Sequence, residues 1–349
     1  MMQLPRRRFL QASAATLAPR LPAASKIRTG ILGIQHSHLS GKLQAMLDNP
    51  AYEVVTICET DADTRKRQSG SKLFANLRWV SVEEMLADKS LDLIVFEGEV
   101  KDAVPMGKRI LQAGKHLHLE KPPTNKMEPF RELANLARER RKLLQLGYLW
   151  RFHDGVIKIQ EAVKNGWLGD VYMIRATINS DRGQSQRDTE ARYPGGALFE
   201  LGGHMIDVVV ALLGRPGNVR HWLRHDTSIK DTLKDNTLAV FEYPRALALV
   251  ISSAKDPANG IHRTFEIIGS GGTMLIAPME PNPILHVHLA QAVGPYKKGA
   301  QQIALPPQPR FIRDFQELAR AIQTNSALRF SYNHELLLHE TLLRASGEI

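Results

Sequence analysis

A regular alternation of strand-like and helix-like segments between Lys26 and Tyr148 constrains the fold of this chain more than any other feature. Five short apolar runs are typical of buried strands: 28–33, 52–58, 91–96, 116–119 and 143–148. Two stretches between them have helical spacing: 102–113 and 128–141. Strands that alternate with helices of this length predict a parallel sheet with helices on both faces. We therefore predict that residues 26–148 form a doubly wound nucleotide-binding domain.

The pattern changes after Trp150. A helix-like segment, a strand-like segment and a polar, arginine-bearing loop (179–196) precede a longer helix at 197–213. Four strand-like runs then follow without intervening helices: 237–243, 246–253, 263–269 and 272–277. Strands joined by short turns predict a mostly antiparallel sheet. The chain has 349 residues, which suits two domains, and we assign 149–349 to an α+β domain.

The N-terminus has the pattern of a twin-arginine export signal. The segment 5–10 reads Pro-Arg-Arg-Arg-Phe-Leu, and a stretch rich in small residues follows up to Ala24. A disordered basic tail is the alternative. We predict that residues 1–25 are a signal peptide and that the mature protein is periplasmic or otherwise exported through the twin-arginine pathway. Twin-arginine substrates are exported folded, so a bound cofactor can be captured before export.

The charge and hydropathy of the chain exclude two classes of partner. The formal net charge is +10, and removal of residues 1–24 leaves +6, without a lysine–arginine block that contains aromatic residues. We therefore predict no nucleic-acid partner. No run of about 18 apolar residues occurs, so we predict no membrane partner once the signal is removed.

A glycine turn follows the first predicted strand. Gly30 and Gly33 lie where a strand–turn–helix unit directs backbone N–H groups and a helix N-terminus at a phosphate. Gln35 and His38 replace the second and third glycines of the usual G-x-G-x-x-G spacing. We predict that Gly30, Gly33, Gln35 and His36 contact a dinucleotide. A purely structural turn is the alternative.

The second predicted strand ends at Glu59. A carboxylate there accepts hydrogen bonds from a ribose diol and repels a 2′-phosphate. This favours NAD over NADP, although the nearby basic run at 65–67 leaves NADP possible. An acid at a helix N-terminus, at Asp61, is a further interpretation that does not exclude the first.

A lysine and a carboxylate follow the strand-like run 116–119, in the sequence Glu120-Lys121-Pro122-Pro123. An ammonium at the strand end can polarise a substrate oxygen and stabilise an alkoxide during hydride transfer. The prolines restrict the backbone and allow a cis bond. A surface lysine is the alternative. We predict that Lys121 acts in catalysis and that Glu120 and Lys121 also contact the cofactor.

Glu200, His204 and Asp207 have the spacing i, i+4 and i+7. On a helix these side chains share one face, with a rise of about 6 Å between the first two. The imidazole of His204 suits a general base, because its ordinary pKa is about 6.5. A cluster of ion pairs on a helix surface is the alternative.

Three histidine pairs invite a metal-binding interpretation, because alternate residues of a strand point the same way. They are His36/His38, His116/His118 and His286/His288. Unrelated pairs without cysteines are more typical of ordinary strands and loops, so we predict no metal site. His36 and His38 are expected to line the cofactor turn instead.

From Lys26 onward the chain resembles the glucose–fructose oxidoreductase/inositol dehydrogenase family, Gfo/Idh/MocA. The segments that carry the resemblance are the Gly33 turn, Glu59, Gly114 to Pro122, Trp150-Arg151-Phe152, Gly195 to Asp207 and the terminal helices. The resemblance implies a nicotinamide-binding Rossmann domain. It also implies a second α/β domain whose sheet makes contacts in a dimer or tetramer, and a carbohydrate or cyclitol substrate between the domains.

The resemblance also assigns roles to residues. Lys121 matches the catalytic lysine of the family and His204 its catalytic histidine. Glu200 stands where aspartate is usual, and we predict that it belongs to the catalytic site and orients the substrate or His204. The expected reaction is hydride transfer from a ring CH–OH carbon to the nicotinamide, with His204 taking the hydroxyl proton. We further predict that Arg151, Asp207 and Tyr193 contact the substrate. Three loop arginines are candidate contacts for an acidic sugar: Arg182, Arg187 and Arg192.

Two other functions remain open. One is a glycoside-cleaving enzyme of the same superfamily, in which transient oxidation of a ring carbon allows elimination and regenerates NAD in each cycle. The other is a non-catalytic protein that binds a sugar or a cofactor, a hypothesis motivated by Gln35 and His38.

Overall fold

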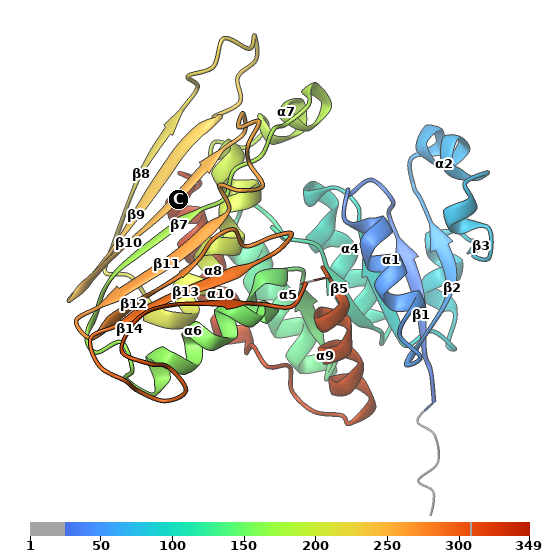
Figure 1. Cartoon of the computed structure of the whole chain (residues 1–349). Coiled ribbons are helices and arrows are strands. Elements are labelled where there is room, and N and C mark those ends of the chain that lie inside the picture. Colours follow the sequence, from blue (N-terminus) through green and yellow to red (C-terminus); the bar gives the residue numbers. More distant parts are fainter. Residues whose placement is uncertain (1–24, 308) are drawn as a thin grey trace, which may run out of the picture.

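The computed structural model describes residues 25–307 and 309–349, and two sheets dominate it (Figure 1). The predicted signal peptide, apart from its last residue, lies outside these residues. The N-terminal sheet is wholly parallel, with the strand order β3-β2-β1-β4-β5-β6. Its strands are β1 (Ile27–Leu32), β2 (Tyr52–Cys58), β3 (Arg78–Trp79), β4 (Leu93–Phe96), β5 (His116–Leu119) and β6 (Leu144–Leu146). The predicted doubly wound sheet is confirmed.

Two apolar cores cover the two faces of this sheet. Along β4, Leu93 and Val95 belong to one core and Ile94 and Phe96 to the other, as the alternation of side chains in a strand requires. The helices that follow the strands are α1 (Leu39–Leu47), α2 (Ala62–Gln68), α3 (Val82–Ala87), α4 (Val100–Gln112) and α5 (Met127–Arg140). Strands buried on both faces explain why the sequence pattern of this domain was clear.

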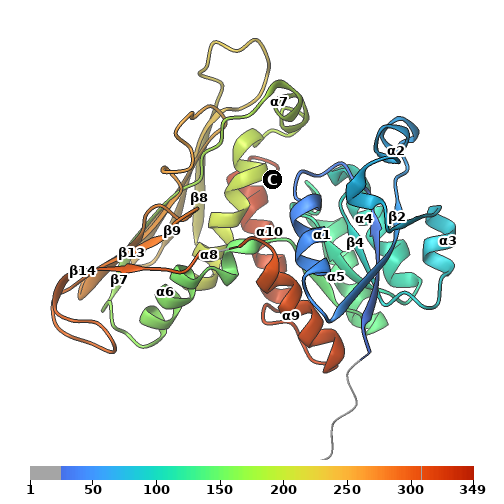
Figure 2. The ribbon, with the colours of Figure 1, turned by 45° about the vertical axis from the view of Figure 1, so that its right-hand side comes forward.

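The C-terminal part of the chain contributes to the core of the N-terminal domain. Phe315 and Leu318 of α9 (Ile312–Gln323) pack in one cluster with Leu43 of α1 and Ile31 of β1. In Figure 2, α9 lies between the N-terminal domain and the second sheet. Residues on both sides of the predicted boundary at residue 148 therefore share one core.

The second sheet has eight strands in the order β14-β13-β12-β11-β7-β10-β9-β8. Only β7 and β10 pair in parallel, so the prediction of a mostly antiparallel sheet is confirmed. Its strands are β7 (Val171–Thr177), β8 (Asn218–Arg224), β9 (Asn236–Tyr243), β10 (Ala246–Ser253), β11 (Thr264–Gly269), β12 (Gly272–Ile276), β13 (Ile284–Leu289) and β14 (Gly299–Ala304). The helices α6 (Asp154–Lys164), α8 (Gly203–Leu213) and α10 (Tyr332–Ala345) cover one face, and no helix formed by the described residues covers the other (Figures 1 and 2).

Two differences from the sequence analysis affect the site. The loop 179–196 contains a short helix, α7 (Gln184–Glu190), and the helix expected from residue 197 begins as a π-helical turn, Leu198–Gly202, before α8. A π turn closes i→i+5 hydrogen bonds, so it changes the angular relation between residues on either side of it. No helix in the described part of the chain is long and apolar enough to cross a bilayer.

Candidate active site

A cleft of about 480 Å³ separates the carboxyl edge of the parallel sheet from the second domain. Its N-terminal wall contains the turn after β1 (35–38), the start of α4 and Lys121 after β5. Its C-terminal wall contains residues of α7, the π-helical turn and His204 of α8. Open α/β sheets bind ligands at this edge, so the cleft is the candidate active site.

Lys121 and Glu200 form an ion pair inside the cleft. The lysine Nζ lies 2.8 Å from Glu200 Oε1 and 2.9 Å from its backbone oxygen, and the lysine side chain is 1% exposed. Burial alone would raise the pKa of Glu200, but Lys121 and His36 lower it to about 2. Lys121 is therefore a buried lysine and a candidate functional residue, not a surface residue. Its peptide bond to Pro122 is cis.

His204 lies in the same cleft as a neutral imidazole. The ring lies 5.8 Å, centroid to centroid, from both Tyr148 and Trp150. Burial, followed by the positive charge of Lys121, lowers the pKa of His204 well below its ordinary value. Its Nδ1 is buried without a hydrogen-bond partner among the described residues. The structure thus places Lys121 and His204 in one cleft, as the sequence predicts.

Gly33 is the glycine that the turn requires. Its φ is +86°, and a Cβ there would lie 2.5 Å from the backbone nitrogen of Gly98. Gly30, in contrast, lies within β1, where its missing side chain makes room for Thr56 and Met85. The structure therefore places Gly33 at the turn, whereas Gly30 has a packing role and does not reach the cleft.

We expect Gly33→Ala to destabilise the protein more than Gly114→Ala. Both glycines have positive φ, which costs an alanine about 1–2 kcal/mol. At Gly33 the new Cβ would also collide with the backbone of Gly98, whereas no atom lies within 4 Å of a Cβ at Gly114. The difference in unfolding free energy, measured with urea, should be at least about 1 kcal/mol. Equal losses in the two variants would show that the close approach at Gly33 relaxes freely.

The N–H groups of the turn are already used inside the protein. Five of them donate to internal acceptors: Gly33 to Cys58 O, Ile34 to Glu59 Oε2, Gln35 and His36 to Glu97 O, and His38 to His36 Nδ1. Glu59, predicted to hold a ribose, is buried and also accepts a hydrogen bond from the backbone of Asp61. The cleft and the Gly33 turn fit a dinucleotide, but these five N–H groups would have to exchange partners to bind its phosphates.

A buried charged cluster lies behind the turn. Lys42 of α1, which is fully buried, bridges Glu97 Oε1 at 2.6 Å and Glu120 Oε2. His38 Nδ1 lies 3.2 Å from the same Glu120 oxygen, and His36 Nδ1 lies 3.7 Å from it. Burial raises the pKa of Glu97 to about 7, whereas Lys42 and His36 outweigh burial and hold the pKa of Glu120 well below its ordinary value. Glu120, predicted to contact a cofactor, thus lies behind the two histidines.

Lys42 and Glu97 were not predicted as site residues, although the sequence pattern around each indicates a buried charge. Lys42 lies on the apolar stripe of α1 with Leu39, Leu43 and Met46, a place where a lysine needs a buried partner. Glu97 directly follows β4, as Glu120 follows the neighbouring β5, so parallel pairing brings both carboxylates to one edge.

Arg151 and Asp207 do not line the cleft, which corrects their prediction as substrate contacts. Arg151 donates to Asp207 at 2.9 and 2.8 Å and to Glu335 at 2.5 Å, and all three side chains are buried. His334 adds a contact of 2.8 Å to Asp207. Glu200 and His204 line the cleft, whereas Asp207 pairs with Arg151 away from it, so the expected common face of the three side chains is not formed.

The loop arginines have different environments. Arg182 and Arg192 line the cleft with Tyr193, as predicted, whereas Arg187 is buried in ion pairs with Asp231 and Asp235. Glu190, at the end of α7, pairs with Arg182 at 2.7 Å. Burial raises the pKa of Glu190 to about 7. This carboxyl group, which the sequence analysis did not single out, can hold or release a proton in the cleft near neutral pH.

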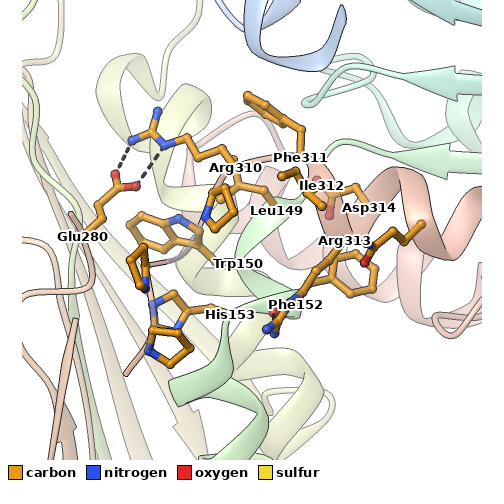
Figure 3. A pocket seen from close by; sticks show the side chains of 14 residues that line it. Leu149, Trp150, Phe152, His153, Glu280, Arg310, Phe311, Ile312, Arg313 and Asp314 are labelled. Atoms are coloured by element: carbon orange, nitrogen blue, oxygen red, sulfur yellow. Dashed lines mark hydrogen bonds and ion pairs between the residues drawn. The ribbon is translucent and has the colours of Figure 1, made fainter. Parts of the chain in front are cut away.

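A second cavity, of about 390 Å³, adjoins the cleft. It shares Leu149, Trp150 and Arg310 with the cleft (Figure 3). In this view the guanidinium of Arg310 pairs with Glu280, at 2.9 Å between Nε and Oε2, beside the ring of Trp150. The two spaces are therefore neighbours.

Comparison with known families agrees with this architecture. Residues 27–148 match the oxidoreductase family with an NAD-binding Rossmann fold, and residues 156–275 match the GFO/IDH/MocA C-terminal domain. The chain belongs to the Gfo/Idh/MocA family. Its first domain is therefore an NAD-binding Rossmann domain, and the resemblance inferred from the sequence motifs is confirmed.

Characterised members of the family are distant relatives. The chain is 28% identical to dTDP-3,4-didehydro-2,6-dideoxy-alpha-D-glucose 3-reductase of Streptomyces violaceoruber, over 58% of this chain and 59% of that protein. It is 27% identical to scyllo-inositol 2-dehydrogenase (NADP(+)) of Bacillus subtilis, over 67% of this chain and 64% of that protein. The chain thus matches about 60% of the length of these relatives.

The fold is shared with a 3-ketoreductase of Actinomadura kijaniata that was solved with TDP-benzene and NADP. The TM-score is 0.73 at 21% identity, and the match covers 92% of this chain and 96% of that one. This likeness supports the arrangement of the two domains.

Proposed function

We propose that the protein is an NAD(P)-dependent oxidoreductase that acts on a ring CH–OH group of a sugar, sugar derivative or cyclitol. The observation that carries the proposal is that Lys121, Glu200 and His204 line one cleft at the carboxyl edge of the NAD-binding domain. The relatives named above act on a nucleotide-linked sugar and on an inositol, which supports this substrate class.

In the proposed reaction the chain supplies charge and a proton acceptor. The nicotinamide, when bound, supplies the C4 position that accepts or returns a hydride. Lys121 donates a hydrogen bond to the substrate oxygen and stabilises its alkoxide character. His204, neutral before the reaction, takes the hydroxyl proton. Glu200 holds the Lys121 ammonium in place through its ion pair.

The test measures reduced dinucleotide formed by the purified chain with NAD and with NADP, against a panel of hexoses, uronic acids and inositols. The proposal expects turnover with at least one member and loss of turnover in His204→Ala with the dinucleotide affinity retained. Absence of turnover with every member, together with unchanged ligand binding in Lys121→Ala, would support the non-catalytic alternative. Mass spectrometry of the natively purified protein identifies which dinucleotide it retains.

Glycoside cleavage by oxidation and elimination is the second candidate. The cavity beside Trp150 favours it, because a saccharide longer than one ring has space next to the cleft. Release of a free sugar from a glycoside, with solvent deuterium incorporated at C2 and no net reduced dinucleotide, would support this candidate. Net reduced dinucleotide with a free sugar would support the first.

We further propose that the helix-free face of the second sheet is a contact surface in a homodimer or homotetramer. Trp222 is 51% exposed, and the β8–β9–β10 register places it in one row with Leu238 and Ile251. An exposed apolar sheet face of this kind marks an interaction site. Trp222→Glu with Ile251→Glu should lower the mass measured by light scattering. Ile261→Glu, at an exposed apolar residue outside the sheet, should not, and an unchanged mass in the double variant would contradict this surface.

Export remains a proposal carried by the N-terminal sequence alone. Replacing both Arg6 and Arg7 with lysine should stop the appearance of the protein in the periplasmic fraction of a bacterial host with the twin-arginine pathway. Unchanged fractionation of this variant would contradict the proposal.

A further inference from the structure

Three side chains behind the glycine turn have the geometry of a metal site. One ligand atom from each of His36, His38 and Glu120 can be chosen so that all three lie within 4.8 Å of one another. The Glu120 Oε2 distances, 3.2 Å to His38 Nδ1 and 3.7 Å to His36 Nδ1, bracket the edge of a tetrahedron of zinc ligands, about 3.4 Å. Imidazole and carboxylate together are ligands that zinc accepts.

A fourth side chain is directed at the same place. Glu97 is fully buried, and its Oε2 lies 3.8 Å from His36 Nδ1 without a hydrogen-bond partner among the described residues. Its other oxygen accepts a hydrogen bond from Lys42 at 2.6 Å. A buried carboxylate oxygen without a partner is costly, so this atom is a candidate ligand.

The charges in the cluster leave room for a cation. Glu97 and Glu120 share one ammonium, that of Lys42, while Lys121 is paired with Glu200. Histidines that bind a metal are neutral, so two ionised carboxylates with one buried ammonium then carry one negative charge in excess. The bound cation would also lie next to the glycine turn, whose N–H groups donate to acceptors within the protein.

We propose, in place of the sequence-based prediction of no metal site, that His36, His38 and Glu120, with Glu97 as the fourth ligand, bind a divalent metal ion of the zinc class. The ion replaces the His38–Glu120 hydrogen bond, while Glu120 Oε2 keeps its hydrogen bond from Lys42. It also displaces the long hydrogen bond, 3.2 Å, from the backbone of His38 to His36 Nδ1. The histidines line the cleft, so the ion has access from solvent. The proposal rests on this geometry and is independent of the oxidoreductase reaction.

The test titrates Zn²⁺ into the untagged, chelator-treated chain against a competing chromophoric chelator, without substrate or dinucleotide. We expect one ion per chain and an affinity at least about 100-fold lower in His38→Ala. His288→Ala is the matched control, because His288 is an exposed histidine of another i, i+2 pair, and it should bind as the unchanged chain does. Mg²⁺ should not compete. Circular dichroism and thermal unfolding report whether each variant is folded.

The proposal is overturned if the unchanged chain binds Zn²⁺ no more tightly than His38→Ala, or if His288→Ala loses as much affinity. Should His38→Ala not fold, a crystal of the unchanged protein soaked in Zn²⁺ decides the question. An anomalous peak among the four side chains supports the site, and its absence from that position overturns it. In each case the dehydrogenase assay is a separate readout, so failure of the metal site leaves the proposed function standing.

Discussion

Replacing Lys121 with methionine is expected to lower kcat about 10²–10³-fold, the usual cost of removing one charged or hydrogen-bonding stabiliser of a developing oxyanion. Methionine has a similar length and no charge, so the cleft keeps its shape. The loss should fall mainly on kcat and not on dinucleotide affinity. Steady-state kinetics with the best substrate, together with dinucleotide titration, measure both quantities.

A structural role for Lys121 would give a different result, because the lysine also pairs with Glu200. We therefore compare Lys121→Met with Glu200→Gln and with the double variant. If Lys121 acts on the substrate, its loss should exceed that of Glu200→Gln, and the double variant should be as inactive as Lys121→Met. Equal losses in both single variants would show that the pair only maintains the cleft. Lys126→Met, at an exposed lysine five residues away, is the control and should keep full activity.

Replacing Arg151 with alanine is expected to destabilise the protein by about 3–5 kcal/mol. The change leaves Asp207 and Glu335 as buried carboxylates without their shared cation. Arg151→Lys should recover only part of the loss, because an ammonium cannot reproduce the two bonds to Asp207. Arg140→Ala, at an exposed residue of α5, should stay within about 0.5 kcal/mol of the unchanged chain. Urea unfolding measures these differences.

The penalty of Arg151→Ala should depend on pH. Burial alone would raise the pKa of Asp207, but Arg151 and His334 hold it below its ordinary value in the folded protein. The stability that this lowered pKa provides is present above the unfolded pKa of about 3.9 and is lost as the pH falls through the folded pKa. In the variant the buried acids take up protons more readily, so its deficit should be larger at neutral pH than in acid. A deficit independent of pH would indicate lost packing alone.

The fold of the first domain could be predicted because its strands are buried on both faces. A run such as Leu93–Phe96 is apolar throughout, and the helices between such runs have a clear period. The second sheet was only half recognised, because strands such as β8 and β14 have one face without helices and carry polar residues there. Helix α9 could not be assigned to the first domain, since its docking on α1 joins residues such as Leu43 and Phe315, which are 272 positions apart in sequence.

The place of a site residue was predictable where the residue follows a strand. It was unpredictable where it depends on contacts with distant segments. Lys121 lies at the sheet edge because β5 ends there. Asp207 pairs with Arg151, which also pairs with Glu335, and these partners come from segments that are distant in the sequence. Lys42 was not predicted as a site residue, because its neighbours on the same helix face are apolar and indicate core packing.

The most direct test of the central claim is a crystal structure of the chain with its dinucleotide and a bound sugar or cyclitol. The account predicts that the nicotinamide C4 and a ring carbon lie about 3–3.5 Å apart in the cleft. The hydroxyl oxygen on that carbon should lie within hydrogen-bond distance of both Lys121 Nζ and a nitrogen of His204. A dinucleotide bound away from the Gly33 turn, or a sugar whose hydroxyl groups reach neither side chain, would contradict the account.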